Sequence, residues 1–238
     1  MQAVILAGGK GTRFGNITKK IPKPMIKIGN KPIIWHIIKH LSSQGVKQFI
    51  VCTGYKEIVI RKYLSTIKEN WDIKCVYTGL NTLTGKRLYK ISKYIKEELF
   101  LMTYGDGVSD INLKKLINMH KKKKKLATVT AVSPVPRFGA IRISNNIVNK
   151  FAEKPLESVN LINGGFFILN KEIFKFLNLK PNVMWEQEPM INLTKKKQLA
   201  AYIHRGFWYA MDTERDQKYL NTIEKKNLYC FNYDKKFT

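Results

Sequence analysis

Four glycines and a group of cations follow a short apolar run near the start of the chain, in the segment "VILAGGKGTRFGNITKKIPKP" at residues 4–24. Glycine lets a backbone approach a ligand closely. A loop of backbone N–H groups beside cationic side chains suits the phosphates of a nucleotide. We therefore predict that this loop binds a polyphosphate. Its cations are Lys10, Arg13, Lys19, Lys20 and Lys23.

Two other kinds of phosphate loop fit this segment less well. A Rossmann dinucleotide site expects a carboxylate about 20 residues after its glycines, to hold the ribose. The first acidic residue of the chain is Glu57. A Walker loop ends a GxxxxG spacing with Gly-Lys-Ser or Gly-Lys-Thr, which this segment lacks. A dinucleotide-dependent oxidoreductase is therefore disfavoured, and a glycine-rich turn without a ligand remains the plain alternative.

Two carboxylates far apart in the sequence are candidate ligands for a divalent cation. Asp106 follows an apolar run in "YGDG", and Asp212 lies in "MDT". Mg²⁺ prefers a few hard oxygen ligands such as carboxylates and phosphates, so both could meet at one ion bound to nucleotide phosphates. Each is also typical of an ordinary turn. His36 and His40 are a zinc-like pair, but without a third ligand nearby their spacing favours a polar helix face.

These residues need elements that position them, and the first half of the chain alternates apolar runs with helical periodicity. Such alternation predicts an α/β fold with a mainly parallel sheet covered on both faces. Ligands of these sheets bind at the carboxyl ends of the strands, which places the loop at residues 8–15 and Asp106 on one rim. Strands are predicted at residues 3–7, 48–53, 73–77, 99–104 and 128–132, and helices at 32–43, 57–64, 85–95 and 112–120.

The second half of the chain changes character. The segment "AIRISNNIVNKFAEKP" predicts a hairpin with its turn at Asn145 and Asn146. The segment "LINGGFFILN" predicts a strand interrupted by two glycines. Helices are predicted at residues 171–177, 188–197 and 214–226, and a strand at 199–204.

The net charge of +26 comes from 43 Lys and Arg residues against 17 Asp and Glu residues. Such a charge suits nucleic acid, an anionic membrane or a phosphorylated substrate. The lysine run at residues 121–125 follows a predicted helix, where lysines are typical of a solvated end, so a nucleic-acid-binding protein is a remote alternative. No apolar stretch is as long as a membrane helix, and three distant cysteines suggest core thiols. We expect a cytoplasmic protein.

Several segments, taken together, resemble the sugar-phosphate nucleotidyltransferase family. The first are "AVILAGGKGTRFG" and "IPKPMIKIGNKPIIWHII". The later segments "FLMTYGDGVSDIN", "ATVTAVSPVPRFGAIRI", "FAEKP", "INGGFFIL", "WEQEPM" and "GFWYAMDTERD" are similar to those of its glucose-1-phosphate cytidylyltransferases. The resemblance covers nearly the whole chain, with the motifs in the same order.

The resemblance implies a Rossmann-like nucleotidyltransferase fold and an enzyme that joins CTP to a sugar 1-phosphate, giving a CDP-sugar and pyrophosphate, with Mg²⁺ as cofactor. The product would serve the biosynthesis of a surface polysaccharide such as a capsule. An acceptor phosphate oxygen would attack the α-phosphorus of CTP in line, so catalysis would consist of alignment and charge neutralisation. Glucose 1-phosphate is the expected acceptor. The alternatives are another sugar phosphate or a phosphorylated amino acid amide of the phosphoglutamine type.

The resemblance also implies roles for individual residues. Arg13 and Lys23 are the expected catalytic residues, Arg13 on the departing pyrophosphate and Lys23 near the α- and acceptor phosphates. Asp106 and Asp212 are the expected metal ligands. The expected nucleotide-binding residues are Gly8, Gly9, Gly11, Thr12, Thr84, Gly85 and Arg87. The expected acceptor-binding residues are Glu153, Lys154, Asn163, Gly164 and Gly165.

One nucleotidyltransferase domain is expected over residues 1–238. Residues 1–133 would form a nucleotide-binding half, and residues 134–238 an acceptor-binding half that completes the metal site. The family resemblance implies a homo-oligomer. One departure from the family is the short segment "STIKENWDIKCVYTG" between Leu64 and Gly79, where similar members carry a longer excursion that bears on subunit contacts.

Overall fold

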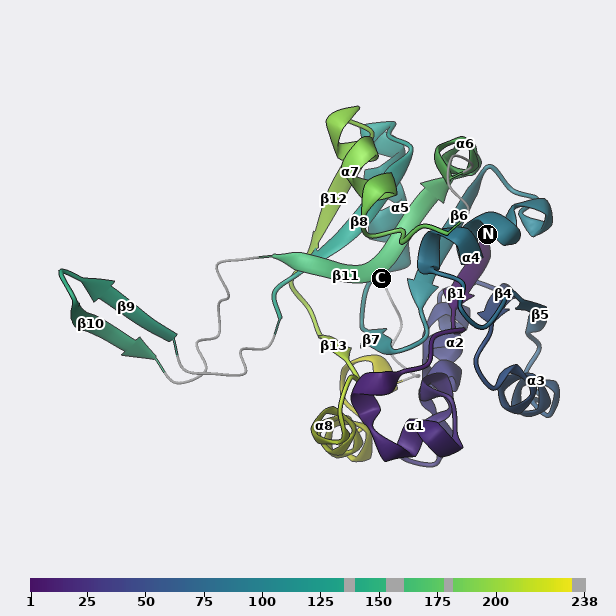
Figure 1. The fold of residues 1–238 in the computed structure, drawn as a ribbon, viewed down its shortest axis with the longest axis horizontal. Helices are drawn as coiled ribbons and strands as arrows, with labels where there is room; N and C mark the ends of the chain where they lie inside the picture. Colours follow the sequence, from purple (N-terminus) through teal and green to yellow (C-terminus); the bar gives the residue numbers. More distant parts are fainter. Residues whose placement is uncertain (135–139, 153–160, 178–181, 233–238) are drawn as a thin grey trace.

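The computed structural model describes residues 1–134, 140–152, 161–177 and 182–232. Within these ranges, strands and helices alternate around a mixed sheet, as the sequence predicts (Figure 1). β11 runs antiparallel to both of its neighbours, and the other adjacent pairs are parallel. The strands lie in the order β12 (Leu199–His204), β8 (Ala127–Val132), β11 (Ile162–Asn170), β6 (Leu99–Tyr104), β1 (Gln2–Leu6), β4 (Gln48–Thr53) and β5 (Asp72–Tyr77).

The helices follow the predicted periodicity, with local differences at their ends. The predicted helix 32–43 begins one residue later because Pro32, with φ −67° and ψ 153°, is its N-cap. The predicted helix 85–95 is a short helix followed by a separate 3₁₀ turn. The α-helices are α1 (Asn16–Lys20), α2 (Ile33–Ser43), α3 (Glu57–Ser65), α4 (Thr84–Lys90), α5 (Leu113–Lys123), α6 (Phe174–Leu177), α7 (Glu188–Lys195) and α8 (Glu214–Lys225). The 3₁₀ helices are η1 (Thr12–Phe14), η2 (Lys23–Met25), η3 (Ser92–Tyr94), η4 (Lys171–Ile173) and η5 (Tyr229–Phe231).

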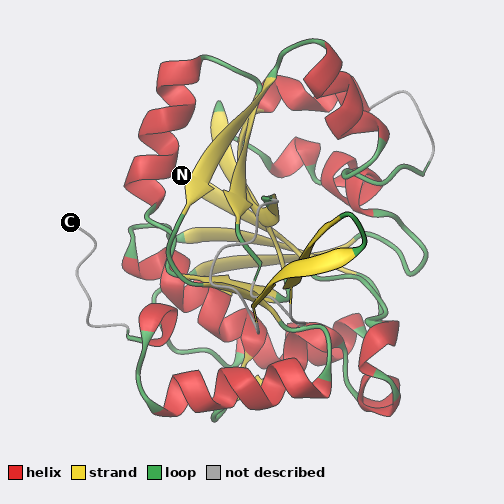
Figure 2. Cartoon of the chain, turned by 90° about the vertical axis from the view of Figure 1, so that its left-hand side faces the viewer, coloured by secondary structure: helices red, strands yellow, loops and turns green. Residues whose placement is uncertain are grey.

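Alternate residues of β1 enter two different cores. Ala3 and Ile5 pack in a core that includes residues of α2, α3, α5 and α8. Val4 and Leu6 pack on the opposite side, in a core that includes residues of α4, α6 and α7. Successive side chains of a strand point to opposite faces, so the apolar residues 3–6 of β1 require helices on both faces of the sheet, as Figure 2 shows. β1 is thereby anchored between two cores directly before the glycine loop.

Three short strand pairs supplement the main sheet. β7 (Gly107–Ser109) pairs with β13 (Trp208–Ala210), and β2 (Lys27–Ile28) pairs with β3 (Lys31–Pro32). The predicted hairpin is confirmed as β9 (Ala140–Ser144) and β10 (Ile147–Ala152), and it stands away from the main sheet in Figure 1. Asn145 and Asn146, with φ of 50° and 63°, form its turn, because asparagine tolerates the left-handed conformation.

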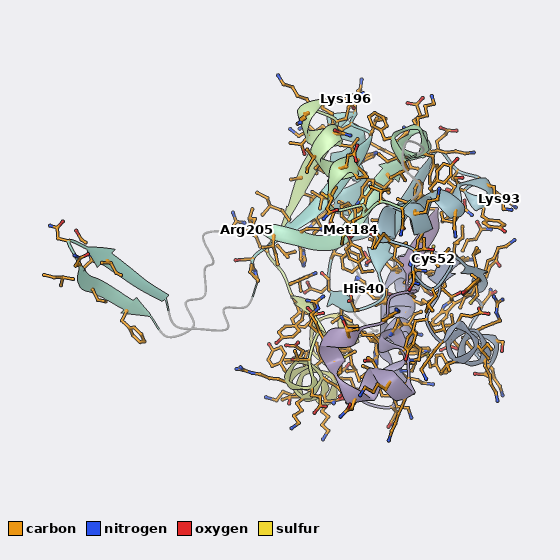
Figure 3. All side chains as sticks on the ribbon, in the orientation of Figure 1. His40, Cys52, Lys93, Met184, Lys196 and Arg205 are labelled. Atoms are coloured by element: carbon orange, nitrogen blue, oxygen red, sulfur yellow. The ribbon has the colours of Figure 1, made fainter. Side chains whose placement is uncertain are left out.

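Several charged or titratable residues outside the predicted site lie either on the surface or in the core. Lys93 and Lys196 extend outward from the body, whereas His40 and Cys52 lie inside it (Figure 3). Burial raises the pKa of the Cys52 thiol to about 12, so it is a core thiol as predicted. The first three lysines of the run at 121–125 end α5 and are exposed, as expected of a solvated helix end. Among the described residues, no helix is long and apolar enough to cross a membrane.

His36 and His40 do not face a common ligand. The Nε2 atom of His36 lies 2.9 Å from the carbonyl oxygen of Ile28, and that of His40 lies 3.2 Å from the carbonyl oxygen of Ile111. Each imidazole therefore satisfies a different backbone group in the core beneath α2. This arrangement agrees with the structural interpretation of the pair.

Candidate active site

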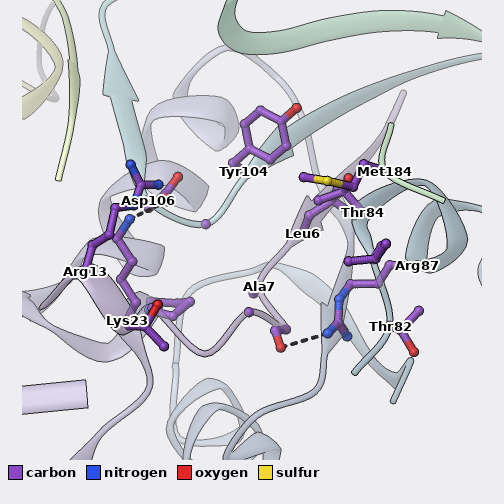
Figure 4. A pocket seen from close by; sticks show the side chains of 17 residues that line it. Leu6, Ala7, Arg13, Lys23, Thr82, Thr84, Arg87, Tyr104, Asp106 and Met184 are labelled. Atoms are coloured by element: carbon purple, nitrogen blue, oxygen red, sulfur yellow. Dashed lines mark hydrogen bonds and ion pairs between the residues drawn. The ribbon is translucent and has the colours of Figure 1, made fainter. Parts of the chain in front are cut away.

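Two adjoining cavities open at the carboxyl ends of β1 and β6, where the sequence places the glycine loop and Asp106. Each has a volume of about 330 Å³. The first cavity is lined by the loop after β1, the start of α4 and the end of β6, and the second by β11, β13 and the segment before α7. The residues that line both are Arg13, Thr84, Tyr104, Asp106 and Met184. In Figure 4, Arg13, Lys23 and Asp106 lie on one side of the first cavity, and Thr82, Thr84, Arg87 and Met184 on the other.

The glycine loop is shaped by its contact with Lys23. Gly11 has a φ of +65°, and a Cβ added to it would lie 2.8 Å from the Cβ of Lys23. Any other residue would be strained by that φ and by the contact. The loop can therefore pass directly over Lys23. The predicted nucleotide-binding residues Gly8, Gly9, Gly11 and Thr12 all line the first cavity.

Lys23 is the charged centre of the site. Its side chain is 8% exposed, and its Nζ donates to Asp106 Oδ2 and to Asp212 Oδ1, each at 2.6 Å. Arg13 Nη1 donates to the other oxygen of Asp212 at 2.8 Å. A buried ammonium group is tolerated when it is paired and hydrogen-bonded. The structure thus brings together the two predicted catalytic cations and the two predicted metal ligands.

The short β7 and β13 pair explains how Asp106 and Asp212 meet although 105 residues separate them. Gly107 pairs with Ala210, and the Met211 N–H donates to the Asp106 carbonyl oxygen at 2.9 Å. Asp106 directly precedes β7, and Asp212 follows β13 by one residue. Antiparallel pairing therefore places both carboxylates at the same end of the ribbon. The predicted sequence elements did not include these three-residue strands.

Asp216 holds the Asp212 turn in place. Its Oδ2 accepts the N–H groups of Asp212 at 3.0 Å and Thr213 at 2.8 Å, and its Oδ1 accepts the Tyr209 hydroxyl at 3.0 Å. Thr213 and Asp216 form a capping box at the start of α8. Burial raises the pKa of Asp216, but the hydrogen bonds, with that from the Thr213 hydroxyl the largest, outweigh it and lower the pKa. Sequence reasoning missed this residue, although "TERD" carries a capping pattern.

Arg87 lies in the wall of the first cavity, with its guanidinium directed at the backbone. Its Nη2 donates to the carbonyl oxygens of Gly8 at 2.9 Å and Leu80 at 3.3 Å. Its Nη1 donates to Thr53 O at 3.2 Å, Gly79 O at 2.7 Å and the Thr78 hydroxyl at 2.6 Å. One side chain thus ties the glycine loop to the ends of β4 and β5. That Arg87 contacts the nucleotide remains a prediction. The structure adds that Arg87 holds the glycine loop in position.

Thr84 and Gly85, at the start of α4, differ in their relation to the cavities. Thr84 lines both of them. Gly85 lines neither and packs against the segment before α7, because a Cβ added to it would lie 2.9 Å from the carbonyl oxygen of Val183. Gly85 therefore lets α4 approach that segment closely.

Three of the five predicted acceptor-binding residues lie within the described part of the chain. Asn163, Gly164 and Gly165 line the second cavity. The strand irregularity predicted at the two glycines is present, because the register of β11 against β8 shifts between Asn163 and Phe167. Glu153 and Lys154 lie outside the described residues.

Four further residues of the second cavity had no assigned site role. Tyr104 ends β6, and Met184 and Glu186 precede α7. Trp208 lines the cavity and donates its indole N–H to Gly164 O at 2.6 Å. The motif "WEQEPM" was the sequence signal for Glu186. Trp185 in the same motif is fully buried in the core.

The family model described as "Nucleotidyl transferase" matches residues 2–221. The chain belongs to the nucleotidyl transferase family. This transferase is 43% identical over 249 aligned positions to the glucose-1-phosphate cytidylyltransferase of Salmonella typhi, covering 95% of this chain and 96% of that protein. The alignment is longer than the 238 residues of this transferase, so the relative contains residues that this chain lacks.

Other relatives show how widely the fold is used. The transferase is 35% identical over 202 residues to the D-glycero-alpha-D-manno-heptose 1-phosphate guanylyltransferase of Campylobacter jejuni, covering 83% of this chain and 88% of that protein. The crystal structure of a UDP-glucose pyrophosphorylase complexed with UDP-glucose superposes with a TM-score of 0.74 at 22% identity, covering 95% of this chain and 99% of that one. The Rossmann-like nucleotidyltransferase fold expected from the sequence is thereby confirmed.

Proposed function

We propose that this transferase joins CTP to a sugar 1-phosphate, with glucose 1-phosphate as the acceptor, and releases pyrophosphate. The observation that carries the proposal is the junction of the two cavities at Arg13 and Asp106, beside Lys23 and Asp212. Two polyanions that repel each other in water can meet there beside two cations. The 43% identity to the Salmonella typhi cytidylyltransferase supports cytosine and glucose as the base and the sugar.

In the proposed reaction, a phosphate oxygen of the acceptor attacks the α-phosphorus of CTP. A new phosphorus–oxygen bond forms, the bond between the α-phosphorus and the bridging oxygen breaks, and pyrophosphate leaves with that electron pair. Lys23 approaches the α- and acceptor phosphates, and Arg13 approaches the departing phosphates. Catalysis by fixed positive charge of this kind contributes most when the charges are held before the reaction begins, and the carboxylates of Asp106 and Asp212 hold them.

We also propose that Asp106 and Asp212 hold Mg²⁺. Lys23 Nζ lies 2.6 Å from an oxygen of each carboxylate, so the two carboxylates lie close together and would share an ion bound beside Lys23. In the described part of the chain no group of three His, Cys, Asp or Glu side chains gathers. Two carboxylates suit Mg²⁺, which keeps water and substrate phosphates as its other ligands. When bound, the ion supplies positive charge to the reacting phosphates.

The test of this function is pyrophosphate release by the purified transferase with Mg²⁺. CTP, UTP, dTTP, GTP and ATP are each combined with glucose 1-phosphate, mannose 1-phosphate, a heptose 1-phosphate and a phosphorylated amino acid amide. Turnover restricted to CTP with glucose 1-phosphate supports the proposal in full. Turnover with CTP and a different acceptor retains the cytidylyl transfer and rejects glucose. A folded protein that releases no pyrophosphate with any pair rejects the function.

A further inference from the structure

Glu186 holds an unusual position between the two cavities. Its Oε2 accepts a hydrogen bond from the Thr84 hydroxyl at 2.6 Å, and its Oε1 accepts one from the Tyr104 hydroxyl. Thr84 and Tyr104 line both cavities, whereas Glu186 lines the second. Burial raises the pKa of the Tyr104 phenol, and the negative charge of Glu186 adds to that effect. The phenol therefore remains a hydrogen-bond donor, and the carboxylate remains the acceptor.

The segment that carries Glu186 is fixed against α4. The Asn182 side chain accepts the Leu83 N–H at 2.8 Å, and Val183 O accepts the Lys86 N–H at 3.2 Å. The Trp185 N–H donates to the Thr84 hydroxyl oxygen at 2.9 Å. The backbone next to Glu186 is thus anchored to α4, and both carboxylate oxygens accept hydrogen bonds. A residue that discriminates between ligands requires such fixed positioning.

Among the described residues, Glu186 differs from the other acidic side chains of the second cavity, which pair with cations. Asp106 pairs with Lys23, and Asp212 pairs with both Lys23 and Arg13. Across the described residues, Glu186 has hydrogen-bond partners but no ion-pair partner. A carboxylate has about four lone-pair positions, so two donors leave room for donors from a ligand.

We propose that Glu186 determines acceptor specificity: its carboxylate accepts hydrogen bonds from the hydroxyls of a neutral sugar ring and disfavours acceptors with a second anionic group at that end. This inference rests on the proposed function and deepens it. The cations at the junction attract the acceptor phosphate. The negative charge of Glu186 farther along the cavity repels a carboxylate, because like charges in a partly desolvated site repel each other strongly. Sugar phosphates are therefore favoured over phosphorylated amino acid derivatives.

The matched probe pair is glucose 1-phosphate and glucuronic acid 1-phosphate, which share the ring and the phosphate and differ by one carboxylate. We expect wild-type enzyme to prefer glucose 1-phosphate. Glu186→Gln removes the charge with little change in shape. It should raise the KM for glucose 1-phosphate about 10- to 100-fold, since hydrogen bonds to a charged group are the stronger kind. It should also reduce the preference for glucose over glucuronic acid at least tenfold, while the KM for CTP changes less than twofold.

Two further measurements make the result decisive. Glu172→Gln removes one exposed carboxylate from η4, which lines neither cavity, and should leave the preference unchanged. Calorimetric binding of both sugar phosphates, in the presence of Mg²⁺ and α,β-methylene CTP, reports the preference without turnover. If wild type binds glucose 1-phosphate selectively, Glu186→Gln loses that preference and neither protein releases pyrophosphate, the proposed function is rejected and the role of Glu186 is supported. An unchanged preference in Glu186→Gln, or a rise in the KM for CTP equal to that for the sugar, overturns the role of Glu186.

Discussion

At the scale of single residues, Lys23 has the most constrained place in the site. Pro22 and Pro24 flank it, and two carboxylates accept from its Nζ at 2.6 Å. Proline restricts its own φ and the conformation of the residue before it. The sequence could therefore predict that this lysine has a fixed direction, but it could not identify the pair of carboxylates that receives the ammonium group.

Replacing Lys23 with methionine should nearly abolish catalysis. The substitution keeps most of the side-chain volume and removes the charge that faces the reacting phosphates. It also removes the ion pair of Asp106 and leaves Asp212 paired with Arg13. We expect kcat to fall by about 10²- to 10³-fold, the usual loss for a fixed charge-stabilising group, in a pyrophosphate-release assay. Lys20→Met, an exposed lysine in the same basic stretch, is the control. An equal loss in both variants would show that general charge, and not this position, matters.

The hydrogen-bond partners of Arg87 could not be predicted from the sequence. Its type and its segment suggested a contact with the nucleotide, and it does line the first cavity. Its guanidinium donates to backbone or side-chain oxygens of Gly8, Thr53, Thr78 and other loop residues. Those acceptors come from loops that are far apart in the sequence, so no local pattern could reveal them.

At the scale of elements, most long strands and helices were predictable because their apolar residues recur at regular spacing. β6 and β12 have the predicted bounds, and α3 and α8 differ from prediction by one residue. The β7 and β13 pair was not predictable. Each strand has three residues, too few for a period, and the pairing is decided by tertiary contacts. This unpredicted pair is the element that brings Asp106 to Asp212.

The first turn of α8 should control the position of Asp212. Asp216→Asn weakens the capping box and the bond to the Asp212 N–H. We expect the free energy of unfolding to fall by about 1–2 kcal/mol, as measured by urea denaturation. The kcat should fall less than in Lys23→Met, because the charged groups remain. Glu214→Gln, which alters the same turn without touching that bond, should change stability by less than about 0.5 kcal/mol. Comparable losses in both variants would contradict a specific role for Asp216.

Helix α2 should make stability depend on pH. Burial lowers the pKa of both His36 and His40 to about 4, and Lys31 near His36 and His204 near His40 add to the effect, while Asp110 opposes it at His40. Unfolded histidine titrates near pH 6.5. Between pH 4 and pH 6.5 the unfolded state binds more protons than the folded state. The free energy of unfolding is therefore highest above pH 6.5 and decreases as the pH falls toward 4. Each histidine contributes up to about 1.4 kcal/mol per pH unit.

Urea denaturation at pH 8, 7, 6 and 5 measures this dependence. We expect a flat stability between pH 8 and 7 and a steep fall below pH 6.5. His40→Asn, although less stable at pH 8, should show a shallower fall because one of the two titrating groups is gone. The same slope in wild type and variant would mean that the loss comes from other groups.

At the scale of the whole molecule, the site joins the two halves of the chain. Gly8, Lys23 and Asp106 come from residues 1–133, and Asn163 and Asp212 come from residues 134–238. Asn163 reaches the site because β11 of the second half lies beside β6 of the first, and Asp212 reaches it because β13 pairs with β7. An alternating pattern of strands predicts a parallel sheet, but it does not specify where an antiparallel strand inserts.

The net charge of +26 should have opposite effects on folding and on substrate binding. Like charges repel more strongly in the compact state, whereas a cationic protein attracts the CTP polyanion. Salt screens both interactions, with a Debye length of about 10 Å at 0.1 M that shortens to about 3 Å at 1 M. Raising NaCl from 50 to 500 mM should therefore increase the midpoint of urea unfolding and raise the KM for CTP roughly 3- to 10-fold.

KCl at the same concentrations should give the same two trends, because screening depends on ionic strength rather than on the cation. The Glu186 preference for a neutral sugar should weaken less with salt than CTP binding does, since a partly buried carboxylate is screened less than exposed lysines. If stability and CTP affinity both fell with salt, the excess charge would act through specific ion pairs. The lysine-rich surface would then stabilise the folded state instead of destabilising it.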